Sequence, residues 1–222
     1  MSRTAFVVAI DGPAASGKGT LARRLAERFG FAHLDTGKLY RATAFLAVRQ
    51  GGDPADPLTA EQAARQLDLA ILADPRLRED TVANAASVVA AIPAVRAALL
   101  DMQRSFAAHP PPPHKGAVLD GRDIGSVVCP EADVKLFVTA TVEARAARRL
   151  KELRQDGAAA IYGDVLQDMK ERDARDSGRR AAPLVAAPDA VTIDTTALDP
   201  DQVLEFASDL IVRALAVRPG QG

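Results

Sequence analysis

The sequence predicts an α/β protein built on a doubly wound parallel sheet of about five strands, with helices on both faces. Short apolar runs with β-branched residues recur along the 222 residues and alternate with stretches of helical periodicity. Strands that are apolar throughout, rather than in alternate positions, are typical of a parallel sheet covered on both faces. In such a sheet, ligands bind at the carboxyl ends of the strands.

The expected elements follow one another along the chain. Apolar runs predict strands over 5–10, 31–34, 117–119, 134–138 and 190–193. Helical periodicity predicts helices over 17–29, 37–49, 142–154, 164–176 and 200–216. Residues 58–107 interrupt this alternation because their pattern is mostly helical, with Pro93 starting a new helix. We expect them to form an excursion over the sheet edge, which the prolines at 110–113 return to the core as a stiff connector.

Composition limits the kinds of function. The net charge of -1 and the 4% aromatic content argue against nucleic-acid binding, and no apolar run approaches the ~20 residues that span a bilayer. No membrane partner is therefore expected. The single cysteine, Cys129, excludes an internal disulfide and any cysteine metal cluster. With Asp11 too early for a signal peptide, we expect a cytoplasmic protein.

The stretch from Val7 to Lys18, "VVAIDGPAASGK", has the pattern of a phosphate-binding loop. Glycines let several backbone N–H groups face one anion, and the helix that follows adds its positive N-terminal end. Lys18 supplies an ammonium for the β- and γ-phosphates. The expected ATP-binding residues are consecutive: Gly12, Pro13, Ala14, Ala15, Ser16, Gly17, Lys18, Gly19 and Thr20. The alternative is a glycine-rich turn without a ligand.

The residue after the lysine departs from the general P-loop. There a Ser or Thr binds magnesium directly, whereas here Gly19 separates Lys18 from Thr20. The "GKGT" sequence resembles nucleoside monophosphate kinases, in which magnesium is held largely through waters and the phosphates. We therefore expect no direct protein ligand to the metal, with Asp120 or Thr20 acting through water.

Two further segments lie where strands are expected to end. In "HLDTGKLYR", Asp35 or Thr36 is positioned to cap a helix, and Arg41 one turn later is positioned to face the phosphate loop. A plain cap with a solvated arginine is the alternative. In "LDGRDIG", Arg122 and Asp123 offer a guanidinium for a phosphate and a carboxylate for a base edge. A local Arg122–Asp123 ion pair is the alternative there.

The predicted helix over 142–154 carries one apolar stripe and one charged stripe, and a pair of charged residues follows in the helix over 164–176. Val142, Ala146, Leu150 and Leu153 repeat at helical spacing and are expected in the core. A second stripe comprises Arg145, Arg148, Arg149 and Glu152, which is either a solvated face or a set of lid arginines. Arg172 and Asp176 are one helical turn apart, which fits either a local ion pair or a binding site.

Five blocks, in order along almost the whole chain, resemble the bacterial cytidylate kinase family. They are "DGPAASGKGT", "LDTGKLYR", "ANAASVVAAIPAVRAALLDMQRSF", "DGRDIGSVVCPEADVKLFVTA" and "ERDARDSGRRAAPL". The resemblance implies one kinase domain over 1–222. Its core is 1–57, 108–144 and 177–222, its nucleoside-monophosphate-binding excursion is 58–107, and its mobile lid is 145–176.

The same resemblance implies the reaction and the residues that carry it. The γ-phosphoryl group of ATP–Mg²⁺ passes to CMP or dCMP, giving ADP and the diphosphate, and the protein is a monomer. The cytosine is surrounded by Thr36, Arg96 and Asp123, with Arg179 near it; the sugar is held by Ser87, Arg172 and Asp176, and the monophosphate by Arg41 and Arg122. The expected catalytic residues are Lys18, Arg122, Arg145 and Arg149.

The chain departs from longer family members over 67–84, where a strand-rich insert is replaced by a short segment, so the excursion is expected to be abbreviated. Two rival functions remain open. One is another small kinase acting on uridylate, adenylate or a sugar acid. The other is a nucleotide-dependent switch or assembly ATPase, although such proteins need Ser or Thr directly after the lysine.

Overall fold

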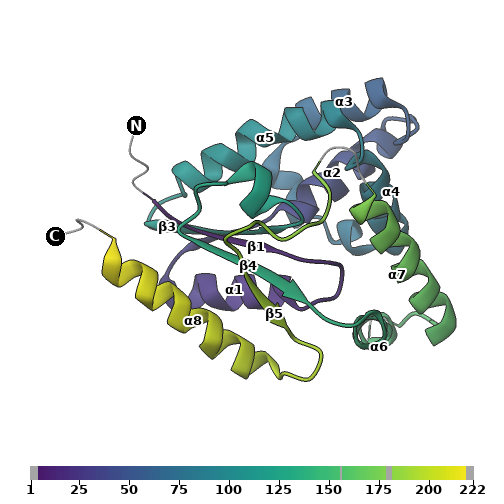
Figure 1. Ribbon diagram of the computed structural model, residues 1–222. Helices are drawn as coiled ribbons and strands as arrows, with labels where there is room; N and C mark the ends of the chain where they lie inside the picture. Colours follow the sequence, from purple (N-terminus) through teal and green to yellow (C-terminus); the bar gives the residue numbers. More distant parts are fainter. Residues whose placement is uncertain (1–4, 156, 179–181, 219–222) are drawn as a thin grey trace.

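The computed structural model describes residues 5–155, 157–178 and 182–218, which form one sheet with helices on both faces (Figure 1). Within these residues the sheet has five strands in the order β2–β3–β1–β4–β5, and every neighbouring pair is parallel. The strands are β1 (Phe6–Asp11), β2 (Ala32–Asp35), β3 (Gly116–Gly121), β4 (Val134–Thr139) and β5 (Val191–Asp194). The predicted doubly wound sheet and its strands are therefore confirmed.

Strand β1 is central and buried along its whole length. Its side chains alternate between two hydrophobic clusters, Val7 and Ala9 joining one and Phe6, Val8 and Ile10 the other. A strand between two apolar layers has to be apolar at every position. This explains the continuous apolar run in the sequence.

Helices cover both faces of the sheet (Figure 1). One face carries α1 (Lys18–Phe29) and α8 (Pro200–Val217), which are joined by ion pairs from Arg24 to Asp201 (2.6 Å) and from Arg28 to Glu205 (2.7 Å). The other carries α2 (Thr36–Arg49) and α5 (Pro93–Ala108). These bounds confirm the predicted helices over 17–29, 37–49 and 200–216 to within one residue.

The excursion between α2 and β3 is helical, as predicted. It contains α3 (Pro57–Arg65), two 3₁₀ turns (Leu69–Ala73 and Pro75–Arg78), α4 (Asp80–Val89) and α5. Asp68 and Asp74 cap the 3₁₀ turns, and Pro93 begins α5 as expected. Among the described residues no single helix is long and apolar enough to span a membrane; α4 and α5 reach that composition only together, across a bend of 100°.

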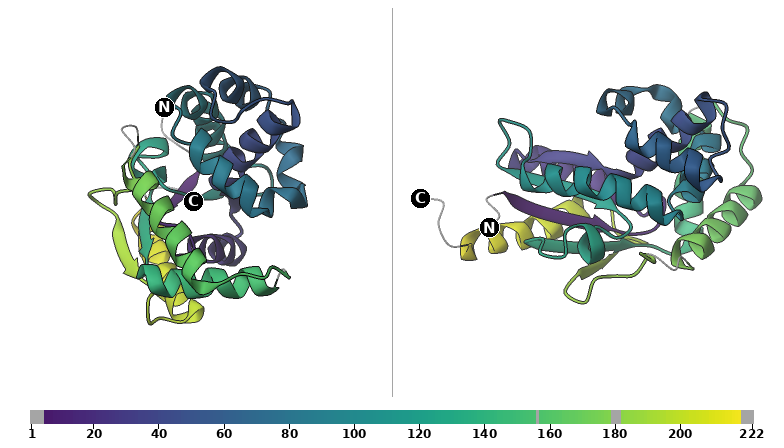
Figure 2. Two further views of the ribbon diagram at one scale, coloured as in Figure 1. Left: turned by 90° about the vertical axis from the view of Figure 1, so that its right-hand side faces the viewer. Right: turned by 90° about the horizontal axis from the view of Figure 1, so that it is seen from above.

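Two helices lie beyond the carboxyl end of β4. They are α6 (Val142–Gln155) and α7 (Tyr162–Ser177), and the views in Figure 2 show α7 close to the helices of the excursion. Their shared contact is a small apolar cluster of Ala146, Val165 and Met169 with partly buried neighbours from the predicted stripe: Val142, Leu150 and Leu153. The stripe therefore packs inward, as expected.

Candidate functional site

The loop between β1 and α1 curls around the carboxyl end of the central strand. Gly12 has φ 152°, and a Cβ there would lie 2.0 Å from the carbonyl oxygen of Val138. Gly17 has φ 91° and caps α1, which starts at Lys18. Both conformations favour glycine. The N-terminal end of α1 thus opens into the loop, in the arrangement that binds phosphate.

Lys18 bends back into this loop. Its Nζ donates to the carbonyl oxygen of Pro13 at 3.1 Å. Burial, followed by repulsion from Arg122, lowers the pKa of Lys18 to about 7. The hydroxyl of Ser16 is also buried and, among the described residues, has no hydrogen-bond partner. The Lys18 ammonium and the Ser16 hydroxyl are both hydrogen-bond donors and are therefore suited to an anionic ligand.

The side chain of Asp120, at the carboxyl end of β3, lies close to the same loop. Its Oδ1 is hydrogen-bonded to His33 Nε2 at 2.8 Å, and its Oδ2 faces the backbone of Gly19. A buried carboxylate beside the phosphate loop is a group that could hold Mg²⁺, because carboxylate oxygens bind this ion directly or through water. Thr20 is exposed. In the described part of the chain, no group of three or more His, Cys, Asp or Glu side chains is arranged to hold a metal.

The acceptor segments meet beside Asp120. Thr36 is buried and donates from Oγ1 to the carbonyl oxygen of Asp120 at 2.8 Å, while Asp35 caps α2 by accepting the N–H of Lys38. Asp123 forms an ion pair with Arg96 of α5. The three residues expected around the base, Thr36, Arg96 and Asp123, therefore come from segments that converge at one end of the sheet.

The alternative of a local Arg122–Asp123 ion pair is wrong. Arg122 Nε donates to Asp176 Oδ2 of α7 at 2.9 Å, whereas Asp123 pairs with Arg96. Adjacent residues on a backbone in extended or irregular conformation point in different directions, so each side chain finds a distant partner. The two side chains thereby connect this loop to two different helices.

Cations crowd the space between the loop and α7. Burial, then repulsion from Arg122, Arg41 and Arg149, lowers the pKa of Arg172 to about 10, whereas Asp176 opposes the fall. Burial, then repulsion from Arg122 and Arg172, also lowers the pKa of Lys18. The Nε of Arg172 is buried and has no hydrogen-bond partner in the described residues. Like charges so close together indicate a site for a multiply charged anion.

The stripe of arginines on α6 is not a uniformly solvated face. Arg145 is buried; its guanidinium donates to the carbonyl oxygens of Ala140 (3.0 Å) and Ala14 (3.3 Å) and pairs with Asp173 of α7. Arg148 donates to Thr195 at 2.9 Å. Arg149 pairs with Asp80 of α4 and Glu152. Arg145 therefore ties the phosphate loop to both α6 and α7.

The remaining predicted residues lie on α4 and after α7. Ser87 is buried, and its Oγ accepts a hydrogen bond from Arg175 Nε at 3.4 Å. Asp176 is buried and holds Arg122. Arg179 lies outside the described residues. The structure thus leaves its expected position near the base as a prediction.

Several residues with contacts in this region escaped the sequence reasoning. They include Asp11, His33, Asp80, Asp173 and Arg175. Asp11 had one signal, since it stands at the end of a strand directly before the phosphate loop. The others are polar residues whose partners are 28 to 88 positions away in sequence, and no local pattern specifies such pairs.

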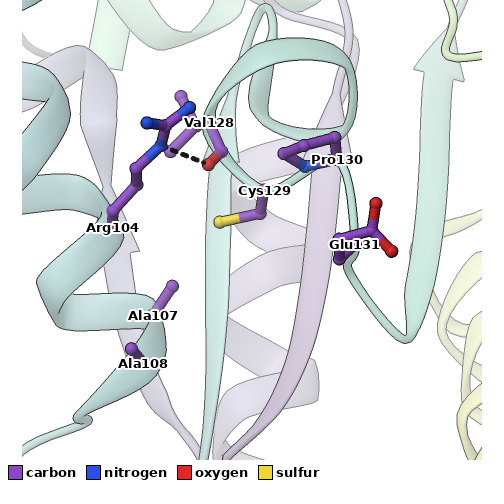
Figure 3. Close-up of a pocket in the computed structure, with 7 residues that line it drawn as sticks. All are labelled: Arg104, Ala107, Ala108, Val128, Cys129, Pro130 and Glu131. Atoms are coloured by element: carbon purple, nitrogen blue, oxygen red, sulfur yellow. Dashed lines mark hydrogen bonds between the residues drawn. The ribbon is translucent and has the colours of Figure 1, made fainter. Parts of the chain in front are cut away.

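A separate cavity of about 340 Å³ lies elsewhere, between the last turns of α5 and the segment before β4 (Figure 3). Arg104 donates to the carbonyl oxygen of Val128 at its edge, and Cys129 and Glu131 contribute to its wall. None of the predicted site residues lines it. It is near the amino end of β4, whereas the phosphate loop follows the carboxyl end of β1.

Comparison with known proteins agrees with this geometry. The sequence model of the family described as cytidylate kinase matches residues 8–213. The cytidylate kinase of Rhodospirillum rubrum is 62% identical over 206 residues, which are 93% of this chain and 97% of the relative. That of Paramagnetospirillum magneticum is 63% identical over 205 residues, 92% of this chain and 97% of the relative.

Among solved structures, a sugar kinase from Janibacter sp. superposes with a TM-score of 0.50 at 16% identity, covering 97% of this chain and 99% of the other. At that identity the likeness supports the fold alone. The sequence match, by contrast, extends over nearly the full length of both chains and includes the phosphate loop, the acceptor segments and α7. The chain therefore belongs to the cytidylate kinase family.

Proposed function

We propose that the crowded cations between the phosphate loop and α7 hold two nucleotides in line, so that the γ-phosphoryl group of ATP passes to CMP or dCMP, the reaction of this family. One observation carries the proposal. Lys18 is repelled by Arg122 and Arg172. Arg172 is in turn repelled by Arg122, Arg41 and Arg149. Asp176 and Asp80 offset part of this repulsion through Arg122 and Arg149, and the phosphates of two nucleotides would neutralise the rest.

The donor nucleotide would occupy the loop from Gly12 to Thr20. Backbone N–H groups at the start of α1 and the Lys18 ammonium suit the β- and γ-phosphates. Mg²⁺ would arrive with ATP and be held through water by Asp120 or Thr20. When bound, the ion neutralises charge on the β- and γ-oxygens.

The acceptor would lie across the loop after β3. Cytosine offers an amino donor beside acceptor atoms, which suits the Asp123 carboxylate and the Arg96 guanidinium, with Thr36 completing the base site. The sugar would contact Ser87, Arg172 and Asp176, and its phosphate Arg41 and Arg122. Arg179 is proposed near the base on the family resemblance. Uridylate lacks the amino donor, so Asp123 would keep its ion pair with Arg96 but lose the hydrogen bond to the base, a loss of roughly 1–3 kcal/mol.

Catalysis would come from orientation and charge rather than from proton transfer. The attacking phosphate oxygen is already anionic, so no general base is needed. Lys18, Arg122 and Arg149 would neutralise the equatorial oxygens. For Arg145 the same role requires it to exchange Asp173 for phosphate as α6 and α7 move. We propose that region 145–176 closes in this way as a lid, excluding water from the reacting phosphates.

The test is an ADP-release assay on the purified protein with ATP–Mg²⁺ and, in turn, CMP, dCMP, UMP, AMP and GMP. We expect the highest kcat/KM with CMP or dCMP and little ADP release without an acceptor. A flat or adenylate-led profile would contradict the assignment. Equal ATP hydrolysis with and without CMP would favour a nucleotide-dependent switch. We also propose that the enzyme is a monomer working in the cytoplasm, and light scattering would test the oligomeric state.

A further inference from the structure

Asp11, the last residue of β1, holds two backbone N–H groups of a segment far away in sequence. The N–H of Ile124 donates to Oδ1 at 2.7 Å, and the N–H of Gly125 donates to Oδ2 at 2.8 Å. Only 4% of Asp11 is exposed. Both carboxylate oxygens therefore accept hydrogen bonds from two consecutive backbone N–H groups.

These two hydrogen bonds join the two halves of the proposed site. The next residue, Gly12, begins the phosphate loop, and the residue before Ile124 is Asp123. Asp11 itself is fixed in the sheet, in register with Gly121 of β3 and Phe137 of β4. One rigid carboxylate thus connects the donor loop to the residue proposed to face the cytosine.

A carboxylate is unfavourable in so buried a position, which argues that its two acceptors are needed. Burial raises the pKa of Asp11 to about 6; the two N–H groups and Arg122 oppose the rise, whereas Asp123 adds to it. Two converging N–H donors require two acceptor atoms. An asparagine would offer one acceptor and direct an NH₂ group at the other donor.

We propose that Asp11 is a positioning residue for acceptor recognition, setting the direction of Asp123 relative to the phosphate loop through its bonds to Ile124 and Gly125. The inference rests on the proposed role of Asp123 in reading the base. Asp11 acts through the loop and does not touch either nucleotide. Its loss should therefore alter selectivity among acceptors more than it alters use of ATP.

The experiment compares kcat and KM of wild type, Asp11→Asn, Asp11→Ala and Asp133→Asn with CMP, UMP and ATP. Asp133 is the matched control, since its Oδ2 accepts the N–H of Val7 at 2.7 Å near the opposite end of β1. We expect the ratio of kcat/KM for CMP to that for UMP to fall roughly 10-fold in Asp11→Asn, as for one lost buried hydrogen bond. It should fall further in Asp11→Ala and stay unchanged in Asp133→Asn.

This ratio does not depend on the fraction of folded enzyme, so a merely structural role would leave it unchanged. Unaltered selectivity in Asp11→Asn would overturn the inference. Asp11→Asn is isosteric and removes a buried charge, so it decides the question if Asp11→Ala does not fold. The proposed function fails separately, if wild type shows no preference for CMP or if Asp123→Asn retains it.

Discussion

Arg149 of α6 forms an ion pair with Asp80 at the start of α4, joining the proposed lid to the excursion that would hold the acceptor. The same guanidinium contributes to the repulsion that Arg172 experiences. Arg149 therefore has two roles: it pairs with the Asp80 carboxylate, and it adds to the positive charge at the proposed phosphate site. Its side chain is 28% exposed and that of Asp80 54%.

Substitution of each partner should separate these two roles. Arg149→Ala is expected to lower kcat at least ~10-fold, because a charge facing the transferring group is lost. Asp80→Ala should change kcat less than about 3-fold and the free energy of unfolding by less than about 1 kcal/mol, since the pair is exposed. Steady-state kinetics and urea unfolding provide the measurements. Equal losses of kcat in both variants would mean that the ion pair itself is required.

Lys18→Ala should reduce kcat by at least ~100-fold, the scale of losing one electrostatic stabiliser. In the part of the chain that the structure describes, its Nζ donates to a carbonyl oxygen of its own loop, that of Pro13, so the fold should survive the substitution. Initial rates with saturating CMP, together with a thermal melting curve, would check both statements. Near-normal turnover would count against the phosphate-loop assignment.

Nucleotide binding should also carry a proton signal. With a pKa of about 7, most Lys18 side chains are neutral at pH 8, and a bound triphosphate favours the charged ammonium. ATP binding at pH 8 should therefore take up about one proton, and affinity should fall as the pH rises from 7 to 9. Calorimetry in buffers of different ionisation enthalpy measures the uptake. Lys18→Arg, which keeps its charge throughout, is the control and should lack this component.

Much of the fold was predictable because its signals are local. Pro93 starts α5, and Asp199 caps α8 by accepting the N–H groups of Asp201 and Gln202. The phosphate loop was equally readable, since its glycines and Lys18 are close together in sequence. These features need no knowledge of the tertiary structure.

The pairing of charged side chains was not predictable in the same way. Arg122 bonds to Asp176, 54 positions away, although Asp123 is its neighbour. Asp11 bonds to backbone groups 113 and 114 positions away. Such partners depend on which strands and helices pack together in the fold, and the spacing of residues in the sequence does not show this. The family resemblance gave the expected members of the site, which stay predictions, whereas the tertiary structure determines which side chains are in contact.

The buried carboxylate of Asp11 should make stability depend on pH with a defined sign. Its pKa is raised from 3.8 to about 6 by burial, so the folded state binds the proton more tightly than the unfolded state does. The stabilisation from that proton is fully present below about pH 4 and is lost as the pH rises through 6, on the order of 3 kcal/mol in all. Urea unfolding at pH 4.5 and 7.5 tests it. Asp11→Asn cannot titrate, so its stability relative to wild type should rise over this interval; a constant difference would contradict the shift.

Arg172 should show a trade between stability and binding. Its guanidinium is repelled by Arg122, Arg41 and Arg149, and its buried Nε lacks a partner among the described residues. Arg172→Met keeps the apolar stem and removes the charge, so it should raise the free energy of unfolding without ligand by roughly 1–3 kcal/mol.

With nucleotide present the order should reverse. CMP should stabilise wild type strongly and Arg172→Met weakly, because the variant has lost a cation proposed to face the acceptor. Thermal melting with and without CMP gives both quantities from one preparation, and the KM for CMP should rise in parallel. Arg65→Met is a suitable control, since Arg65 pairs only with Glu61 on the surface of α3 among the described residues. If Arg172→Met were less stable than wild type without ligand, the crowding of like charges would not be the dominant effect at this position.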